Sequence, residues 1–398
     1  MKTKVAVIFG GRTVEHEVSI ITGIQAFCAL NREKYDPIPL YISKDNRFYT
    51  GEALGKIETY RDMKACLAAA TQVLLVPSEN GVDMIRYPAK KFGNNVVGSF
   101  EVALPAVHGT NVEDGTLMGF LEMLNVPYAA CDVTSSAVGM DKFLMKSALR
   151  DAGVPVLPAL AFLGKEYALN SETVCDTIEK EIGYPVIVKP VNLGSSVGIS
   201  RADTREKLQI ALDTAFGFAP RVLVEKAVTP LREINCSVLG DAENARPSVC
   251  EEPIGSDEIL SFGDKYLSGG NKSGKSGGMS DLKRRCPADI PDKMTAKVQD
   301  LAVKTFVALG CTGVARIDFL NNPETGELWV NEINTIPGSL AFYLWEEAGL
   351  PFDKLLDEMI ALAWARQRRR ESLSFSYETN LLSTVSLGGA KGAKGGKL

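Results

Sequence analysis

The chain has 398 residues, of which 45% are hydrophobic and 23% charged, the balance of an ordinary soluble globular protein with two or three domains. The 49 acidic and 44 basic residues give a net charge of −5, which argues against a general nucleic-acid-binding protein. The 8 cysteines form no CxxC pair and only 2 histidines are present, so neither a zinc site nor a disulfide framework is indicated. The opening apolar run VAVIF is too short for a signal peptide, and no stretch approaches the ~20 apolar residues of a membrane span, so we expect a cytoplasmic protein.

The start of the chain predicts a strand followed by a helix. Residues 4–9 form a continuous apolar run that ends at Gly10 and Gly11, as a buried parallel strand does when it leads into a helix. The segment VEHEVSIITGIQAFCAL has helical spacing, but the turn lacks the third glycine of GxGxxG, so the indication of a dinucleotide site is weak. Glu17 in the first helical turn is either a ligand-facing carboxylate or a solvated one that the helix dipole favours.

A second strand, glycine loop and helix follow in VALPAVHGTNVEDGTLMGFLEMLNVPYA. Together with the first unit they predict a small doubly wound α/β domain over the first ~130 residues. His108 stands where a strand of this unit ends, at the edge where open α/β sheets bind ligands. A lone histidine in such a place is more often a structural residue, so both interpretations remain open from the residues alone.

Lysines mark the next two predicted elements. Ser135 and Ser136 predict the cap of one helix that continues to Gly153, with Lys142 one turn before a second lysine. Lysines on an exposed helix are usually solvated. The run YPVIVKP places Lys189 at the end of a buried strand, where an unpaired cation is costly, so an anionic partner is expected.

The loop VNLGSSVGISRA lies between two runs with strand character. Gly194 and Gly198 free backbone N–H groups, and Ser195 and Ser196 add hydroxyls, so the loop is able to wrap a phosphate. A plain hairpin loop is the alternative.

Residues 255–285 form a long glycine-rich segment. Its GGNKSGKS satisfies the P-loop expression GxxxxGK[ST], but a P-loop needs a buried strand before it and a helix after it, and neither pattern is present. We therefore reject the P-loop interpretation. A segment of this kind inside a compact domain is usually an active-site lid or disordered.

The strongest chemical signal lies in RIDFLNNPETGELWVNEINTIPGS, residues 316–339. Two β-branched apolar runs flank a turn-forming NNPETG, which predicts a hairpin. Asp318 on one strand then faces Glu332 and Asn334 on the other, and such oxygen ligands suit magnesium. Arg316 shares the face of Asp318 and is able to stabilise developing charge. The alternative is a surface hairpin with a polar face.

RIDF followed by VNEINTIPG resembles the metal-binding end of the ATP-grasp enzymes, and specifically of the D-alanine–D-alanine ligase family. HGTNVEDGT and KPVNLGSSVG resemble further motifs of that family, and the resemblance covers nearly the whole chain. It implies an α/β and α+β protein with an ATP-grasp fold and an N-terminal doubly wound (Rossmann-like) domain. The expected parts are an N-terminal domain at 1–134, a central ATP-grasp subdomain at 135–228, a C-terminal catalytic domain at 229–376 with a lid at 255–287, and a tail at 377–398 with a disordered end.

The resemblance also implies the reaction. Two D-alanine molecules are joined to D-alanyl-D-alanine, for peptidoglycan precursors, with ATP hydrolysis and an acyl-phosphate intermediate. The implied cofactors are ATP and two Mg²⁺ ions, for which Mn²⁺ is an alternative. The implied partners are these small molecules, with no nucleic acid and no membrane, and a homodimer is the expected assembly.

Individual roles are carried over by position. The resemblance places Glu17, His108 and Ser195 at the first substrate; Lys142, Lys189, Ser195, Ser196, Glu225, Lys226, Val228 and Glu233 at ATP; Asp318, Glu332 and Asn334 at the metal; Arg316 and the N–H of Gly338 at the oxyanion; and Lys265 and Tyr266 in the lid.

The chain departs from its family at the second substrate. The family follows its glycine with a serine and a leucine that hold the incoming carboxylate, and the matching positions here are Tyr343 and Leu344. A phenol is able to donate one hydrogen bond, but its ring takes up space. D-lactate is disfavoured because the lid has no histidine. The remaining alternatives are another acceptor such as D-serine, a non-catalytic nucleotide-binding paralogue that would have lost metal ligands or phosphate lysines, and an unrelated oxidoreductase.

Overall fold

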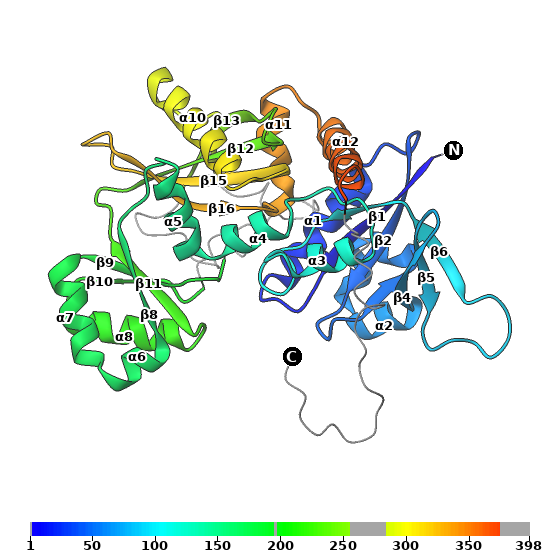
Figure 1. The fold of residues 1–398 in the computed structure, drawn as a ribbon, viewed down its shortest axis with the longest axis horizontal. Helices are drawn as coiled ribbons and strands as arrows, with labels where there is room; N and C mark the ends of the chain where they lie inside the picture. Colours follow the sequence, from blue (N-terminus) through cyan, green and yellow to red (C-terminus); the bar gives the residue numbers. More distant parts are fainter. Residues whose placement is uncertain (1, 195–196, 255–283, 375–398) are drawn as a thin grey trace, which may run out of the picture.

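The computed structural model describes residues 2–194, 197–254 and 284–374, which contain three β-sheets (Figure 1). Each sheet carries helices and its own apolar core. Each of the three expected domains contains one sheet, while their exact boundaries stay a prediction. Within the described residues, no helix is both long and apolar enough to cross a membrane.

The first sheet has the strand order β6-β5-β4-β3-β2-β1-β7. Its buried centre is β1, which pairs in parallel with β2 and β7, as the apolar run near the N-terminus predicts. The strands are β1 (Thr3–Gly10), β2 (Tyr35–Ile42), β3 (Phe48–Thr50), β4 (Thr71–Ser78), β5 (Gly81–Arg86), β6 (Val96–Phe100) and β7 (Val102–Pro105). The helices here are α1 (His16–Ala29), η1 (Glu52–Gly55), η2 (Ile57–Arg61), α2 (Met63–Ala69) and α3 (Thr116–Met123).

Strands β3 to β6 form an antiparallel meander that extends this sheet. The sheet is therefore mixed, and the doubly wound pattern describes only its parallel part. The meander escaped prediction because its strands are largely solvent-facing, as the exposed positions along β4 show.

The second sheet is antiparallel, in the order β10-β9-β11-β8. Its strands are β8 (Ala159–Leu163), β9 (Val186–Pro190), β10 (Ser200–Ala202) and β11 (Arg221–Lys226), and its helices are α6 (Gly164–Leu169), α7 (Ser171–Glu181) and α8 (Arg205–Phe216). Val174 and Ile178 on α7 pack with Leu208 on α8 in the core. The spacing of four between Val174 and Ile178 puts both on the face toward the sheet.

The third sheet has the order β14-β13-β12-β15-β16. Its strands are β12 (Arg232–Gly240), β13 (Arg246–Pro253), β14 (Arg284–Arg285), β15 (Gly313–Asn321) and β16 (Leu328–Asn334). Its helices are α10 (Asp292–Ala308), η4 (Gly338–Ala341), α11 (Phe342–Glu347) and α12 (Phe352–Glu371). Val298, Ala302 and Phe306 recur every four residues on α10 and bury that face against the sheet.

The predicted hairpin is confirmed. Strands β15 and β16 pair antiparallel, with Asp318 opposite Glu332 and Arg316 opposite Asn334. A register shift follows Asp318. Because most of β15 is buried, the alternative of a polar-faced surface hairpin is wrong.

The single helix predicted between Ser135 and Gly153 is wrong, because two helices occupy this stretch. α4 (Val133–Met140) is capped by Asp132, whose side chain accepts from the N–H of Ser135. α5 (Lys142–Asp151) begins afresh because Asp141 is extended and its side chain accepts from two N–H groups of the next turn. The break leaves Lys142 at the start of α5, where its own N–H donates to Val191 O (2.9 Å).

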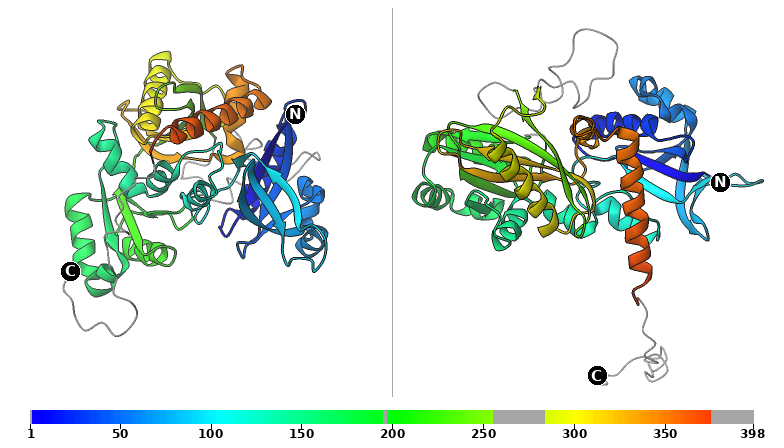
Figure 2. Two further views of the ribbon diagram at one scale, coloured as in Figure 1. Left: turned by 45° about the vertical axis from the view of Figure 1, so that its right-hand side comes forward. Right: turned by 90° about the horizontal axis from the view of Figure 1, so that it is seen from above.

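Helix α12 joins the first and third sheets. It runs along the boundary between them (Figure 2), and it contacts α1, β7 and β15. Leu355, Leu356 and Met359 on α12 are buried in the core of the first sheet. The relative position of these two sheets is therefore fixed by apolar packing.

A left-handed turn stands at this boundary. Ser339, Leu340 and Ala341 have φ values of 54°, 52° and 50°, although none is glycine. The left-handed region costs an L-residue about 1–2 kcal/mol, so three in succession need support from their surroundings. All three residues are buried, and the packing around them supplies part of this support.

Polar groups of the first domain hold this turn. The N–H of Ser339 donates to Thr22 Oγ1 (3.0 Å), which lies 2.7 Å from His108 Nε2. His108 Nδ1 lies 2.9 Å from Ile336 O, a carbonyl that only accepts, so Nδ1 carries the proton and Nε2 accepts from Thr22. Glu113 Oε1 accepts from the N–H of Ile336 (3.0 Å). The turn is thereby bound to α1 and to the loops after β7.

This network predicts an acid-sensitive stability. Burial lowers the pKa of the His108 imidazole from 6.5 to about 4, so below pH 6.5 the unfolded chain binds a proton that the folded chain excludes. The stabilisation from neutral His108 is complete above about pH 6.5 and declines by about 3 kcal/mol as the pH falls to 4. Urea unfolding at pH 4.5 and 7 should show a smaller loss for His108→Gln than for the wild type. Equal losses would contradict the assignment.

Candidate active site

The hairpin gathers its polar side chains at one place. Arg316 holds Asp318 with two parallel bonds, Nε to Oδ1 (2.7 Å) and Nη2 to Oδ2 (2.8 Å). Asn334 Nδ2 donates to Asp318 Oδ2 (3.0 Å), and Glu332 Oε2 pairs with Lys142 Nζ (3.1 Å). Two carboxylates, an amide and two fixed cations therefore converge across β15, β16 and the start of α5.

These ligand types fit a hard divalent cation. Within the described residues, no three His, Cys, Asp or Glu side chains are arranged around a common metal position. A metal at this hairpin therefore needs the amide oxygen of Asn334 beside the carboxylates of Asp318 and Glu332. Such an all-oxygen set suits Mg²⁺, which also retains positions for water and phosphate oxygens.

A buried group of lysines lies behind the hairpin. Glu225 accepts from Lys189 Nζ (2.5 Å) at Oε1 and pairs with Lys146 Nζ (2.9 Å) at Oε2. Lys189 also donates to Asn331 Oδ1 (3.0 Å), and Lys142 donates to Leu193 O (2.8 Å). The buried ammonium of Lys189 is thus paired with a carboxylate of the protein itself, and the sequence did not reveal this partner.

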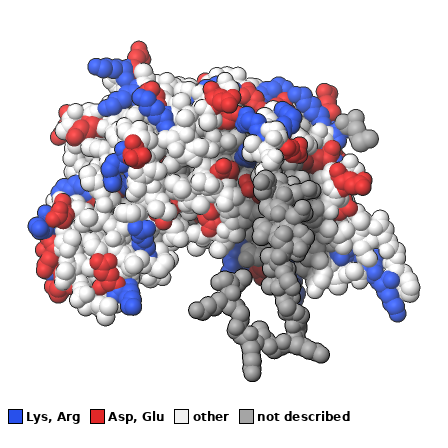
Figure 3. All heavy atoms as spheres, viewed as in Figure 1, with Lys and Arg blue, Asp and Glu red and all other residues white. Residues whose placement is uncertain are grey.

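The charges of this group do not balance. Lys142, Lys146 and Lys189 share the carboxylates of Glu225 and Glu332, and burial lowers the pKa of Lys146. One excess positive charge remains beside the glycine loop that follows β9. On the face drawn in Figure 3, acidic and basic side chains are interspersed. The three lysines are buried, so their positive charge lies inside the molecule.

The remaining described residues expected at ATP lie on β11, on β12 and in the connection between them. Lys226 Nζ donates to the carbonyls of Gly183 (3.1 Å) and Tyr184 (2.5 Å), while Val228 and Glu233 are half-buried. Their roles stay predictions. Ser195, Ser196, Lys265 and Tyr266 lie outside the described residues, as does the rejected P-loop match.

Glu17 does not lie in this site. Its side chain is 69% exposed on α1 and pairs with Lys44 (2.8 Å), the solvated arrangement that the residues alone left open. Glu15, two residues earlier, is buried instead. A Cβ atom on Gly194 would lie 3.0 Å from Glu15 Oε2, so this carboxylate faces the start of the glycine loop.

Glu15 also lies close to Glu113. Burial, with the charge of Glu15 as the next cause, raises the pKa of the Glu113 carboxyl to about 8. Glu15 stands just before α1, and Ser19 and Thr22 follow it at helical spacing. Ser19 Oγ accepts from the N–H of His108 (2.9 Å), so one face of α1 meets the loop after β7. Glu15, Ser19 and Thr22 are separated by four and then three residues, and this helical spacing was the signal in the sequence that points to Glu15.

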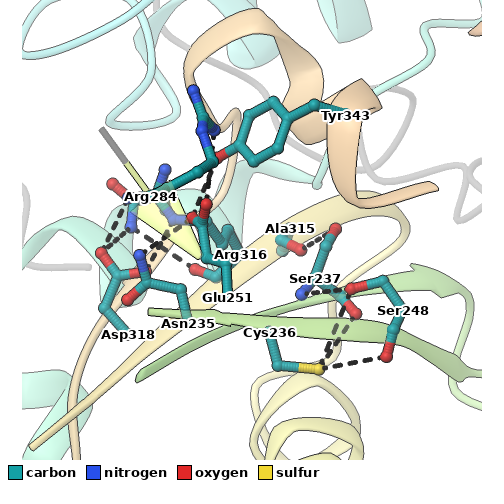
Figure 4. A network of polar contacts seen from close by, with 11 residues as sticks. Asn235, Cys236, Ser237, Ser248, Glu251, Arg284, Ala315, Arg316, Asp318 and Tyr343 are labelled. Atoms are coloured by element: carbon teal, nitrogen blue, oxygen red, sulfur yellow. Dashed lines mark hydrogen bonds and ion pairs between the residues drawn. The ribbon is translucent and has the colours of Figure 1, made fainter. Parts of the chain in front are cut away.

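The positions expected at the second substrate are both on α11. Leu344 is fully buried, so its side chain lies in the core. The hydroxyl of Tyr343 donates to Glu251 Oε1 (3.0 Å), and the guanidinium of Arg284 lies 3.8 Å from the centre of the Tyr343 ring (Figure 4). Sequence reasoning missed Arg284 and Glu251.

Comparisons with known proteins show the family to which the chain belongs. Two family models match the chain, "D-ala D-ala ligase N-terminus" at residues 4–131 and "D-ala D-ala ligase C-terminus" at residues 148–361. The D-alanine–D-alanine ligase of Thermosipho melanesiensis is 35% identical over 379 residues, covering 95% of this chain and 98% of the relative. That of Geobacillus kaustophilus is 35% identical over 385 residues, covering 95% and 99%.

Solved structures give the same result for the fold. The D-alanine–D-alanine ligase of Coxiella burnetii superposes with a TM-score of 0.76 at 28% identity, covering 93% of this chain and 96% of that one. The VanG D-Ala:D-Ser ligase of Enterococcus faecalis superposes with a TM-score of 0.75 at 30% identity, covering 91% and 100%. The expected ATP-grasp fold is confirmed, and the chain belongs to the D-alanine–D-alanine ligase family of ATP-dependent D-amino-acid ligases.

Proposed function

We propose that this ligase joins two D-alanine molecules into D-alanyl-D-alanine in the cytoplasm, as a step of peptidoglycan precursor synthesis. The observation that carries the proposal is the convergence of Arg316, Asp318, Glu332 and Asn334 on one hairpin, with the excess cation of the lysine group behind it. This arrangement suits a triphosphate with its metal beside a reacting carboxylate.

The lysines position ATP. Lys142 and Lys189 are placed to donate to phosphate oxygens, and Lys146 maintains positive charge on the far side of Glu225. Asp318, Glu332 and Asn334 would hold magnesium, which when bound offsets charge on the β- and γ-phosphates.

Glu15 binds the first substrate, in the role that the sequence suggested for Glu17. Its buried carboxylate faces the glycine loop and is able to attract the ammonium group of a D-amino acid. The ammonium fixes which end of the molecule enters, so the substrate carboxylate is directed toward the γ-phosphate.

The bond is made in two steps. A carboxylate oxygen of the first D-alanine attacks the γ-phosphorus, and ADP leaves. The neutral amine of the second D-alanine then attacks the acyl carbon, and phosphate leaves as it takes the bonding electrons. Arg316 Nη1, buried and without a hydrogen-bond partner among the described residues, is the donor for the oxygen that gains charge, together with the N–H of Gly338.

D-Serine is the second candidate acceptor. Tyr343 and Arg284 occupy the region where the family pattern has a short hydroxyl, and the Enterococcus faecalis relative is a D-Ala:D-Ser ligase. A non-catalytic paralogue is disfavoured because the metal ligands and phosphate lysines are all present.

One experiment tests the proposal directly. Phosphate release is measured with ATP, Mg²⁺ and a panel of D-alanine, D-serine, D-lactate and L-alanine, and the products are identified by mass. We expect release that depends on D-alanine, with D-alanyl-D-alanine as the main product. Release that no D-amino acid stimulates would overturn the proposal, and a D-alanyl-D-serine product would select the second candidate.

The metal assignment predicts large losses at two positions. Asp318→Asn and Glu332→Gln should each retain less than about a tenth of wild-type phosphate release, a barrier increase above ~1.4 kcal/mol, because an amide does not supply the lost charge. Glu324→Gln, at an exposed carboxylate in the turn of the same hairpin, serves as the control with unchanged release. Near-normal turnover of either site variant would exclude that ligand.

The substrate assignment predicts different effects at neighbouring glutamates. Glu15→Gln should raise the KM of the first D-alanine by at least about tenfold, because the ammonium loses its counter-charge. Glu17→Gln removes an exposed ion pair and should change that KM by less than about twofold. Steady-state kinetics of both variants decide the matter, and the reverse ranking would restore Glu17.

A further inference from the structure

Two buried guanidinium nitrogens lie close to the proposed reacting centre without partners. Among the described residues, neither Nη2 of Arg284 nor Nη1 of Arg316 has a hydrogen-bond acceptor. The side chains are only 11% and 7% exposed. A buried charged donor without an acceptor is costly, so such a pair indicates a missing anion.

The surroundings fix the orientation of Arg284. Glu251 Oε2 pairs with Arg284 Nη1 (3.3 Å), and Glu251 Oε1 accepts from Tyr343 and from Asn235 Nδ2 (3.1 Å). The Tyr343 ring supports the guanidinium from one side, and Figure 4 shows Tyr343, Arg284 and Glu251 close to Arg316. Within the described residues, Nη2 of Arg284 is left as a buried donor of this network without an acceptor.

Tyr343 itself is not available as a donor. Its one hydroxyl proton is used on Glu251, so the phenol is able only to accept from a ligand. A substrate carboxylate only accepts at neutral pH. Among the described residues, the buried donor beside Tyr343 that suits a carboxylate is therefore Arg284.

The position agrees with the chemistry of the second step. The amine and the carboxylate of an α-amino acid are separated by one carbon atom. An amine that attacks the acyl carbon beside Arg316 therefore carries its carboxylate within a few bond lengths of that residue. Burial raises the pKa of the Tyr343 hydroxyl while the charges of Arg316 and Arg284 lower it, so both guanidiniums lie near this phenol.

We propose that Arg284 is the residue that binds the carboxylate of the second substrate, with the Tyr343 ring limiting the acceptor to a small side chain. The inference rests on the proposed ligase function and adds a specificity-determining residue to it. Recognition by a guanidinium requires an acceptor with a free carboxylate.

D-Alaninamide separates the two substrate sites. It has an amine but no carboxylate, so it is able to act as acceptor and not as the molecule that is phosphorylated. With both compounds present, the mass ratio of D-alanyl-D-alanine to D-alanyl-D-alaninamide measures how strongly the enzyme selects a carboxylate. This ratio does not depend on the folded fraction of a variant.

We expect Arg284→Gln to lower that ratio at least tenfold, Arg284→Lys to lower it less, and Arg285→Gln to leave it unchanged. Arg285 is the matched control because its side chain is 51% exposed and pairs with Glu252 and Asp289. If Arg284→Gln makes neither product, the ratio of Arg284→Lys decides and must lie below the wild-type value.

The outcomes that overturn the inference are distinct from failure of the proposed function. An unchanged ratio in Arg284→Gln, or an equal drop in Arg285→Gln, means that Arg284 does not bind the carboxylate. Absence of both products with the wild-type enzyme instead refutes D-alanine ligation itself.

Discussion

The site depends on a backbone conformation that its own residues disfavour. Three successive left-handed residues follow Gly338, and the contacts that hold them come from the other side of a domain boundary. Thr22 accepts from the turn, and His108 and Glu113 bind the carbonyl and the N–H of Ile336 just before it. Strain of this kind persists only where the surroundings fix it. Helix α1 and the loop after β7 therefore hold the turn that follows Gly338.

The charged side chains of the hairpin are likewise held in place by their neighbours. In the described structure Asp318 is bound by Arg316 and Glu332 by Lys142, two cations to which we assign roles in the proposed reaction. When no substrate is bound, these pairs hold the charged groups in place, because a buried charge is tolerated only when it is paired. Arrival of a metal and a triphosphate adds charges of both signs, so carboxylates and lysines are able to exchange partners while each buried charge stays paired.

Local patterns in the sequence predicted the hairpin, whereas Arg284 was missed because its contacts are long-range and the break at Asp141 because its cap is inconspicuous. A period of two and a turn-forming NNPETG were sufficient to place Asp318 opposite Glu332. Arg284 belongs to a two-residue strand, which no periodicity reveals, and its partner Glu251 is 33 residues away. The break at Asp141 was missed because a capping side chain inside a helical pattern resembles an ordinary exposed residue.

The placement of Glu17 away from the hairpin has a physical explanation in α1. Residues 17 and 15 both carry carboxylates near the helix start, but a helix turns by about 100° per residue, so they point in opposing directions. The face of α1 that lies toward the neighbouring loops and the left-handed turn carries Glu15, Ser19 and Thr22, which are four and then three residues apart. Ser19 and Thr22 bind the loop and the turn, while Glu15 faces the glycine loop. One rigid helix thus fixes both the group proposed for the first substrate's ammonium and the turn that presents the Gly338 N–H, so a shift of α1 would disturb substrate binding and charge stabilisation together.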